Sequence, residues 1–111
     1  MDVNLPPRLQ SNLTQQRQAY HQEIEAQLAR WRADIATMEA DMAGASLKHQ
    51  MTLQKYLTDL KAKLAQAEIQ VDELEEKTGD AWTKLQTDID DLQQDISESV
   101  DQAQKEFHLI S

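Results

Sequence analysis

Four aspartates in the last third of the chain form its densest group of candidate metal ligands: Asp88, Asp90, Asp91 and Asp95. On a helix, Asp88, Asp91 and Asp95 would share one face, and hard divalent cations bind several carboxylate oxygens at once. A helix, however, spreads its carboxylates along its length, and the sequence contains no glycine-bearing calcium loop. The group therefore indicates either a weak cation site or a solvated acidic face, and we expect no established metal site.

The remaining candidates for chemistry are isolated. His21, His49 and His108 lie far apart in the sequence and belong to no His-Glu-x-x-His or Glu-x-x-His metal motif. The sequence has no cysteine and no glycine-rich phosphate loop. Serine, histidine and aspartate are present, but a narrow helical protein offers no evident cleft in which they converge. We therefore expect no catalytic residues, no cofactor and no enzymatic activity.

Charge narrows the choice of partners. The formal net charge is −9, and most of the acidity lies in residues 80–111. An acidic surface argues against binding to nucleic acid, which requires a basic face, and against docking on anionic membranes. The first residues lack the pattern of a signal peptide, and no apolar run approaches the length that spans a bilayer. These features favour a soluble, cytoplasmic protein.

The composition is typical of long helices, because glycine, proline and aromatic residues are scarce and no period-two strand pattern is present. Apolar residues recur at steps of three and four in three stretches, as in a coiled coil. The first stretch contains Leu13, Tyr20, Ile24, Leu28, Trp31, Ile35, Met38, Met42 and Ala45. The second contains Leu53, Leu57, Leu60, Leu64, Ala67, Val71 and Leu74, and the third contains Trp82, Leu85, Ile89, Leu92, Ile96, Val100, Ala103, Phe107 and Ile110.

The two glycines fall between these stretches. The apolar frame shifts by one residue across Gly44, and Ser46 can cap a following helix. Gly79 is placed to end a helix in the left-handed conformation, and Asp80 to cap the next one. The sequence thus predicts an all-α, antiparallel three-helix bundle with helices over residues 11–43, 46–77 and 80–110. The alternative is a longer helical hairpin that dimerises, with one glycine inside a continuous helix.

The two ends of the chain differ in character. Residues 1–10, which include adjacent prolines, are predicted to form a flexible N-terminal arm, and residues 11–110 a single bundle. Residues 107–110 are more apolar than a frayed end requires. They either close one end of the bundle or form a docking patch for another subunit.

The aromatic side chains fall on or beside the apolar stretches and are not interleaved with basic residues, which disfavours stacking on nucleic-acid bases. We expect five residues to form the core or an interaction surface: Trp31, Tyr56, Trp82, Phe107 and Ile110.

Several short motifs are shared with a family of small, soluble bacterial coiled-coil proteins of unassigned activity. They are Ala26-Gln27-Leu28 with Trp31 and Ile35, Tyr56 with Leu60-Lys61, Gly79-Asp80-Ala81-Trp82 with Leu85, and Ala103 with Phe107. The chain resembles this family over most of residues 20–107, and Gly-Asp-Ala-Trp is the most specific part. The region of Gly44 and the adjacent prolines depart from the family pattern. The resemblance implies a non-enzymatic factor, in some members associated with stress, and it carries over no catalytic residue.

These observations favour a non-enzymatic coiled-coil protein that acts structurally or through protein–protein interaction, either with another protein or with itself as a homodimer. One alternative is a weak ion or small-molecule binder that uses the acidic third helix or a gap lined by Trp31 and Tyr56. Another is an amphipathic protein of lipid surfaces, which the low basic content disfavours.

Overall fold

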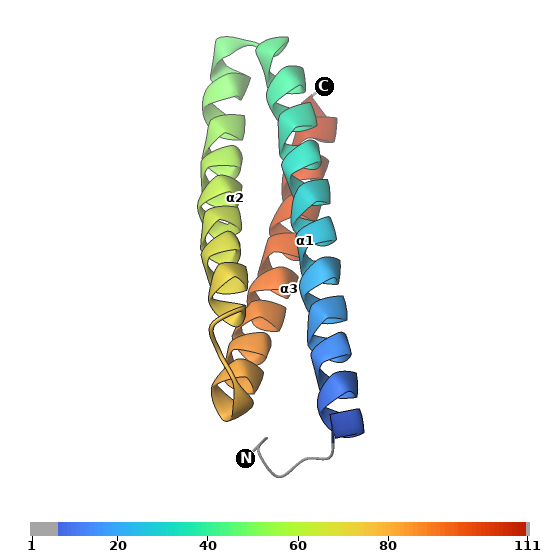
Figure 1. Cartoon of the computed structure of the whole chain (residues 1–111). Coiled ribbons are helices and arrows are strands. Elements are labelled where there is room, and N and C mark those ends of the chain that lie inside the picture. Colours follow the sequence, from blue (N-terminus) through green and yellow to red (C-terminus); the bar gives the residue numbers. More distant parts are fainter. Residues whose placement is uncertain (1–6, 111) are drawn as a thin grey trace.

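The computed structural model describes residues 7–110, with the side chains of residues 13–109. The chain forms three helices, α1 (Pro7–Ala43), α2 (Leu47–Leu74) and α3 (Gly79–Ile110). They run up, down and up in a rod 62 Å long and about 18 Å wide, so that the C-terminal end of α3 lies beside the α1–α2 turn (Figure 1). The predicted all-α, antiparallel three-helix bundle is confirmed.

The core is a single layer formed by the three predicted apolar stretches. All seven predicted residues of α2, from Leu53 to Leu74, are buried. The buried residues of the other two helices are Ile24, Leu28, Trp31, Ile35, Met38, Leu85, Ile89, Ile96, Val100, Ala103 and Phe107. Tyr20, Met42, Ala45, Trp82 and Leu92 pack partly buried against them. Heptad spacing therefore determines which face of each helix turns inward.

The α1–α2 turn follows the sequence prediction closely. α1 ends at Ala43, and the Gly44 amide donates to the Asp41 carbonyl at 3.2 Å. Ser46 is extended, and its hydroxyl accepts the His49 amide at 3.4 Å, as expected of an N-cap. Since both glycines lie at connections, the alternative with a glycine inside a continuous helix is wrong.

The α2–α3 connection differs from the prediction in two ways. α2 ends at Leu74 rather than at residue 77, because the amides of residues 75–77 bond to carbonyls three residues back, which tightens the chain into a 3₁₀-like turn. Gly79 has the predicted left-handed conformation, with φ of 56°, but it begins α3 instead of following α2 directly. Asp80 therefore lies inside the first turn of α3, where its charge suits the positive end of the helix dipole, rather than at the N-cap.

The predicted boundary of the N-terminal arm is also corrected. α1 begins at Pro7, so residues 7–10 are helical; a proline ring suits the first turn of a helix, which needs no amide donor there. Residues 1–6 of the predicted arm lie outside the described residues.

The three helices do not contribute equally to packing. α2 packs extensively against both α1 and α3, whereas α1 and α3 contact each other much less. Ion pairs support both interfaces of α2. Arg32 of α1 binds Glu68 at 2.6 Å, Glu39 of α1 binds Lys61 at 3.0 Å, and Asp95 of α3 binds Lys63 at 3.2 Å. No helix in the described part of the chain is both long enough and apolar enough to cross a membrane.

Candidate interaction surface

The predicted acidic face of α3 is partly engaged by α2. Asp88, Asp91 and Asp95 are all exposed, and Asp95 is engaged by the Lys63 ammonium, which also binds Asp59 at 3.2 Å. Burial alone would lower the pKa of Lys63, but the hydrogen bonds and charges of Asp59 and Asp95 outweigh it and raise that pKa. Across the residues described, no three His, Asp or Glu side chains are grouped so that they could hold an ion. Part of the acidic face therefore serves to bind α2.

The three histidines are divided between the ends of the bundle. His21 lies near the α2–α3 loop, with its Nε2 atom 3.6 Å from a carboxylate oxygen of Glu25 and 3.6 Å from one of Glu75. His49 and His108 line a common hollow of about 690 Å³ beside the α1–α2 turn, whose other lining residues include Phe107. Their separation in the sequence concealed this proximity, which follows from the return of α3 to the first turn (Figure 1).

The end of the bundle at the α2–α3 loop contains an aromatic and cationic cluster. The Trp82 ring packs edge-on against Tyr20 at 5.6 Å, and the Arg17 guanidinium lies over Trp82 at 4.9 Å. The Tyr20 hydroxyl donates to Asp90 Oδ1 at 2.6 Å and lies 3.2 Å from the Gln86 carbonyl. Burial, together with the hydrogen bond to Asp90 and its charge, raises the pKa of Tyr20 far above its usual range. Tyr20 thus joins α1 to α3 as a neutral phenol.

Beside this cluster lies a hollow of about 560 Å³, whose lining includes Arg17, His21, Lys77 and Trp82. The Arg17 Nε atom is shielded from solvent and has no hydrogen-bond partner in the described structure. The Arg17 guanidinium and the Lys77 ammonium can bind a small anion, whereas the Glu75 carboxylate, which also lines this hollow, opposes it.

The five predicted core or interaction residues have different environments. Trp31 and Phe107 are buried, and Tyr56 and Trp82 are partly buried against the core. The side chain of Ile110 lies outside the described residues. Tyr56 lines a shallow hollow with Lys63 and Asp95, and Trp31 is not part of it. Trp31 and Tyr56 therefore do not line this hollow together.

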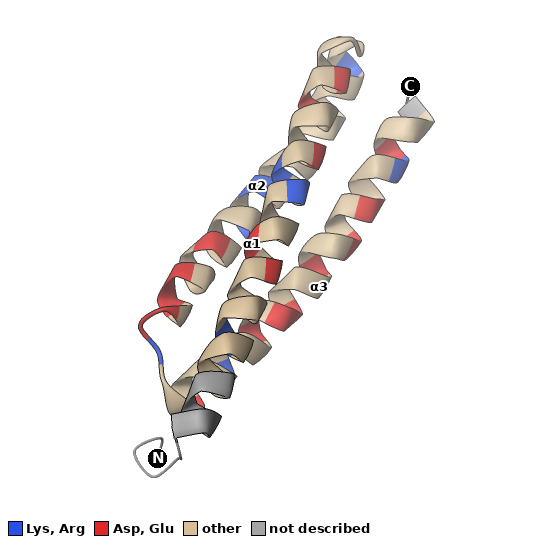
Figure 2. Ribbon diagram, turned by 45° about the vertical axis from the view of Figure 1, so that its right-hand side comes forward, with Lys and Arg blue, Asp and Glu red and all other residues tan. Residues whose placement is uncertain are grey.

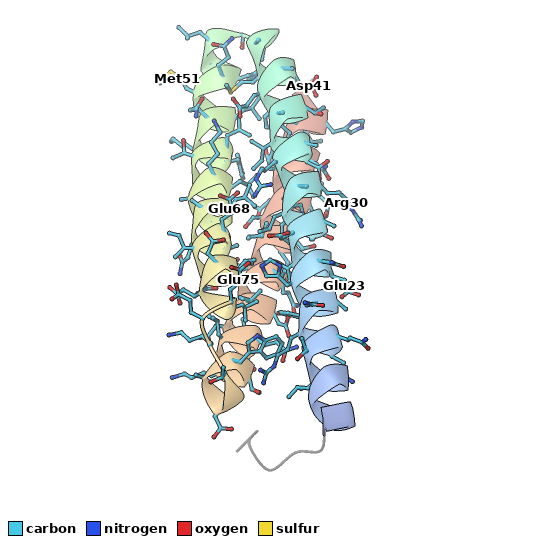
Figure 3. All side chains as sticks on the ribbon, viewed as in Figure 1. Glu23, Arg30, Asp41, Met51, Glu68 and Glu75 are labelled. Carbon is cyan, nitrogen blue, oxygen red and sulfur yellow. The ribbon has the colours of Figure 1, made fainter. Side chains whose placement is uncertain are left out.

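The outward side of α2 carries an apolar stripe that the sequence analysis missed. Leu47, Met51 and Ile69 are 74%, 66% and 60% exposed. At 100° per residue they fall within about 40° of one another, and the small residues between them share the same face. We call this surface the outer stripe: Leu47, Met51, Thr58, Ala62, Ala65 and Ile69, all exposed. Figure 3 shows Met51 projecting from the side of α2 that faces away from α1.

A signal for the outer stripe was present in the sequence. Ile69 follows Met51 by 18 residues, or five helical turns, so both return to the same side of the helix. Both residues are out of phase with the inner heptad positions of α2. A single heptad stripe on α2 therefore does not include them.

Charges beside the outer stripe differ from those on the inward flanks of α2. The inward charges Lys61, Lys63 and Glu68 are all ion-paired with α1 or α3. Beside the stripe, Lys48 and Lys55 lie in the N-terminal half of α2, and Glu73 lies near its C-terminal end. None of these three forms an ion pair within the described residues. Beside the outer stripe, α2 is therefore basic toward its N-terminal end and acidic toward its C-terminal end (Figure 2).

No protein-family model, no curated protein and no solved structure matches the chain.

Proposed function

We propose that this protein is a non-enzymatic helical protein that acts by binding another protein chain through the outer stripe of α2. One observation carries the proposal. Of the four large apolar side chains that are exposed among the described residues, three lie on this single helix face. Apolar residues scattered singly over a surface need no explanation, whereas a row along one face is typical of a helix that docks on another helix.

The geometry of the stripe defines the kind of partner. Leu47 and Ile69 are 22 positions apart, so the stripe is about 33 Å long at 1.5 Å per residue. The small side chains of Thr58, Ala62 and Ala65 in its middle allow close approach of another backbone. The partner surface is therefore a helix of about six turns with its own apolar row, flanked by charges complementary to those of α2.

The cellular setting of this interaction rests on other grounds. The acidic composition and the absence of cysteine favour the cytoplasm, and the family resemblance favours a role under stress. Quantitative proteomics of cells with and without stress checks this part of the proposal. The abundance of the protein should rise under stress.

Photo-cross-linking in living cells tests the proposed surface. A photoreactive amino acid replaces Met51 in one strain and Ala33, an exposed residue of α1, in a matched control strain. We expect a discrete covalent adduct from position 51 and none from position 33. Absence of any adduct at position 51, with the helical structure of the variant intact, would contradict the proposal.

A second candidate function, binding of a small anion, is favoured by the hollow beside Arg17 and Trp82. It differs from the two locations considered in the sequence analysis, because the required basic groups come together only in the folded bundle. Titration with inorganic phosphate or acetate, monitored by tryptophan fluorescence, tests it. Saturable quenching that Arg17→Gln abolishes would support binding there, and an unchanged spectrum at millimolar anion would exclude it for these anions.

A further inference from the structure

We infer that the partner of the outer stripe is a second copy of this chain, whose α2 lies antiparallel to the first. This inference rests on the proposed function, because it names the occupant of the same surface. It adds three things that the proposal leaves open: the identity of the partner, the direction of its helix and the residues that face each other.

Direction follows from the charges beside the stripe. Lys48 and Lys55 accompany it in the N-terminal half of α2, and Glu73 lies on the same flank near the C-terminal end. In a parallel pair, the lysine ends of both copies would adjoin each other. In an antiparallel pair, each lysine-bearing half lies beside the acidic half of the other copy. Because like charges disfavour association and opposite charges favour it, the antiparallel arrangement is selected.

The register follows from the apolar residues. A two-fold axis near the middle of the stripe places Met51 of one copy against Ile69 of the other, and Thr58 against Ala62. The same register brings Lys48 opposite Asp72 and next to Glu73, and it brings Leu47 opposite Glu73. The pair Met51–Ile69 and the charge of Lys48 thus favour the same alignment, and the contact is isologous, since each copy uses the same surface.

The size of the contact predicts its strength. A stripe about 33 Å long and one helix diameter wide, about 10–12 Å, covers several hundred square ångströms on each copy. The total, about 700 Å², is below the range for specific interfaces, which corresponds to a weak and reversible dimer. We therefore expect a Kd on the order of micromolar.

Cysteine cross-linking tests both identity and direction, and it suits a chain that contains no native cysteine. The full-length variants Lys48→Cys and Glu73→Cys are prepared separately, together with Ala33→Cys as an exposed control on α1. Each variant is treated on its own with a short bifunctional maleimide. Lys48→Cys and Glu73→Cys are also treated together as a mixture. Circular dichroism establishes that each variant retains its helical structure.

The antiparallel dimer predicts a covalent dimer in the mixture of Lys48→Cys and Glu73→Cys, at least tenfold above the level in either variant alone or with Ala33→Cys. Two copies of position 48 would lie roughly 37 Å apart, beyond the reach of the reagent. Efficient cross-linking of Lys48→Cys with itself would show a parallel pair and overturn the inference, as would a complete lack of cross-linking above the control. In the latter case, an adduct between position 51 and a different protein in cells would leave the proposed function standing.

Discussion

The two faces of α2 differ in what they contact. The inner face packs inside the bundle. Its seven heptad residues are buried, and Lys61, Lys63 and Glu68 at its edges are paired with α1 or α3. The outer face carries large apolar side chains in solvent, and the charges beside it have no partner in the described structure. α2 therefore has more apolar surface than its own bundle buries, and substitutions on each face can test the distinction.

The largest effect is expected on the inner face. Leu57 is fully buried at the centre of α2, so Leu57→Ala should lower the free energy of unfolding by about 2–5 kcal/mol. Met51→Ala, on the outer face, should change the stability of the monomer by less than about 0.5 kcal/mol. Urea denaturation at a protein concentration below the Kd measures both. Equal losses from the two substitutions would remove the distinction between the faces.

The next effect concerns association rather than folding. Met51→Glu should weaken the dimer by roughly a hundredfold, because two symmetry-related methionine contacts of about 1.4 kcal/mol each are lost and a carboxylate is placed opposite the acidic end of the other copy's α2. Sedimentation equilibrium measures the Kd, and Ala33→Glu on α1 is the matched control. An unchanged Kd for Met51→Glu would place the contact elsewhere.

Substitution of Tyr20 tests whether the polar contact between α1 and α3 also stabilises the fold. Tyr20→Phe should cost about 1–2 kcal/mol, because it removes a hydrogen bond to a carboxylate. Since the pKa of Tyr20 is raised in the folded state, the phenol of the unfolded chain ionises first, and stability is lost as pH rises above about 10.

Substitution of a second tyrosine, Tyr56, is the control for this pH dependence. The loss of stability between about pH 10 and pH 12 should become smaller in Tyr20→Phe than in the native protein. Tyr56→Phe, which removes a hydroxyl that makes no hydrogen bond in the described structure, should retain it. If both variants follow the native curve, the Asp90 contact does not form in solution.

The smallest effect is expected from the charges beside the outer stripe. Lys48→Glu should weaken the dimer by about two- to fivefold for each of two symmetric pairs, as is typical of exposed ion pairs. Adding Glu73→Lys to the same chain should restore the native Kd in an antiparallel dimer, because each reversed charge again meets its opposite. Failure of this rescue at low ionic strength would contradict the proposed register.

Heptad spacing made the inner face predictable, since residues at steps of three and four fall on one side of a helix regardless of the rest of the fold. The first turn was predictable because Gly44, Ser46 and the frame shift coincide. The end of α2 was not, because helical periodicity continues through residues 75–77 although their hydrogen bonds shift to a tighter turn. Pattern alone does not distinguish these two hydrogen-bonding arrangements.

The candidate sites were predicted less well. The contact of Tyr20 with Asp90 joins residues 70 positions apart, so it depends on how the helix ends meet. The outer stripe was missed for a different reason. Leu47, Met51 and Ile69 lie outside the inner heptad positions of α2, and their spacing describes a second face.

The central claim is that the outer stripe of α2 joins two copies of this chain, and sedimentation velocity tests it most directly. The native protein and Met51→Glu are compared over about 1 to 500 µM, a range that spans the expected Kd. We predict that the native protein shifts from 12.7 kDa toward twice that mass as concentration rises, and that Met51→Glu needs about a hundredfold higher concentration for the same shift. A native protein that stays at 12.7 kDa throughout, or a Met51→Glu variant that dimerises as readily as the native protein, would contradict the claim.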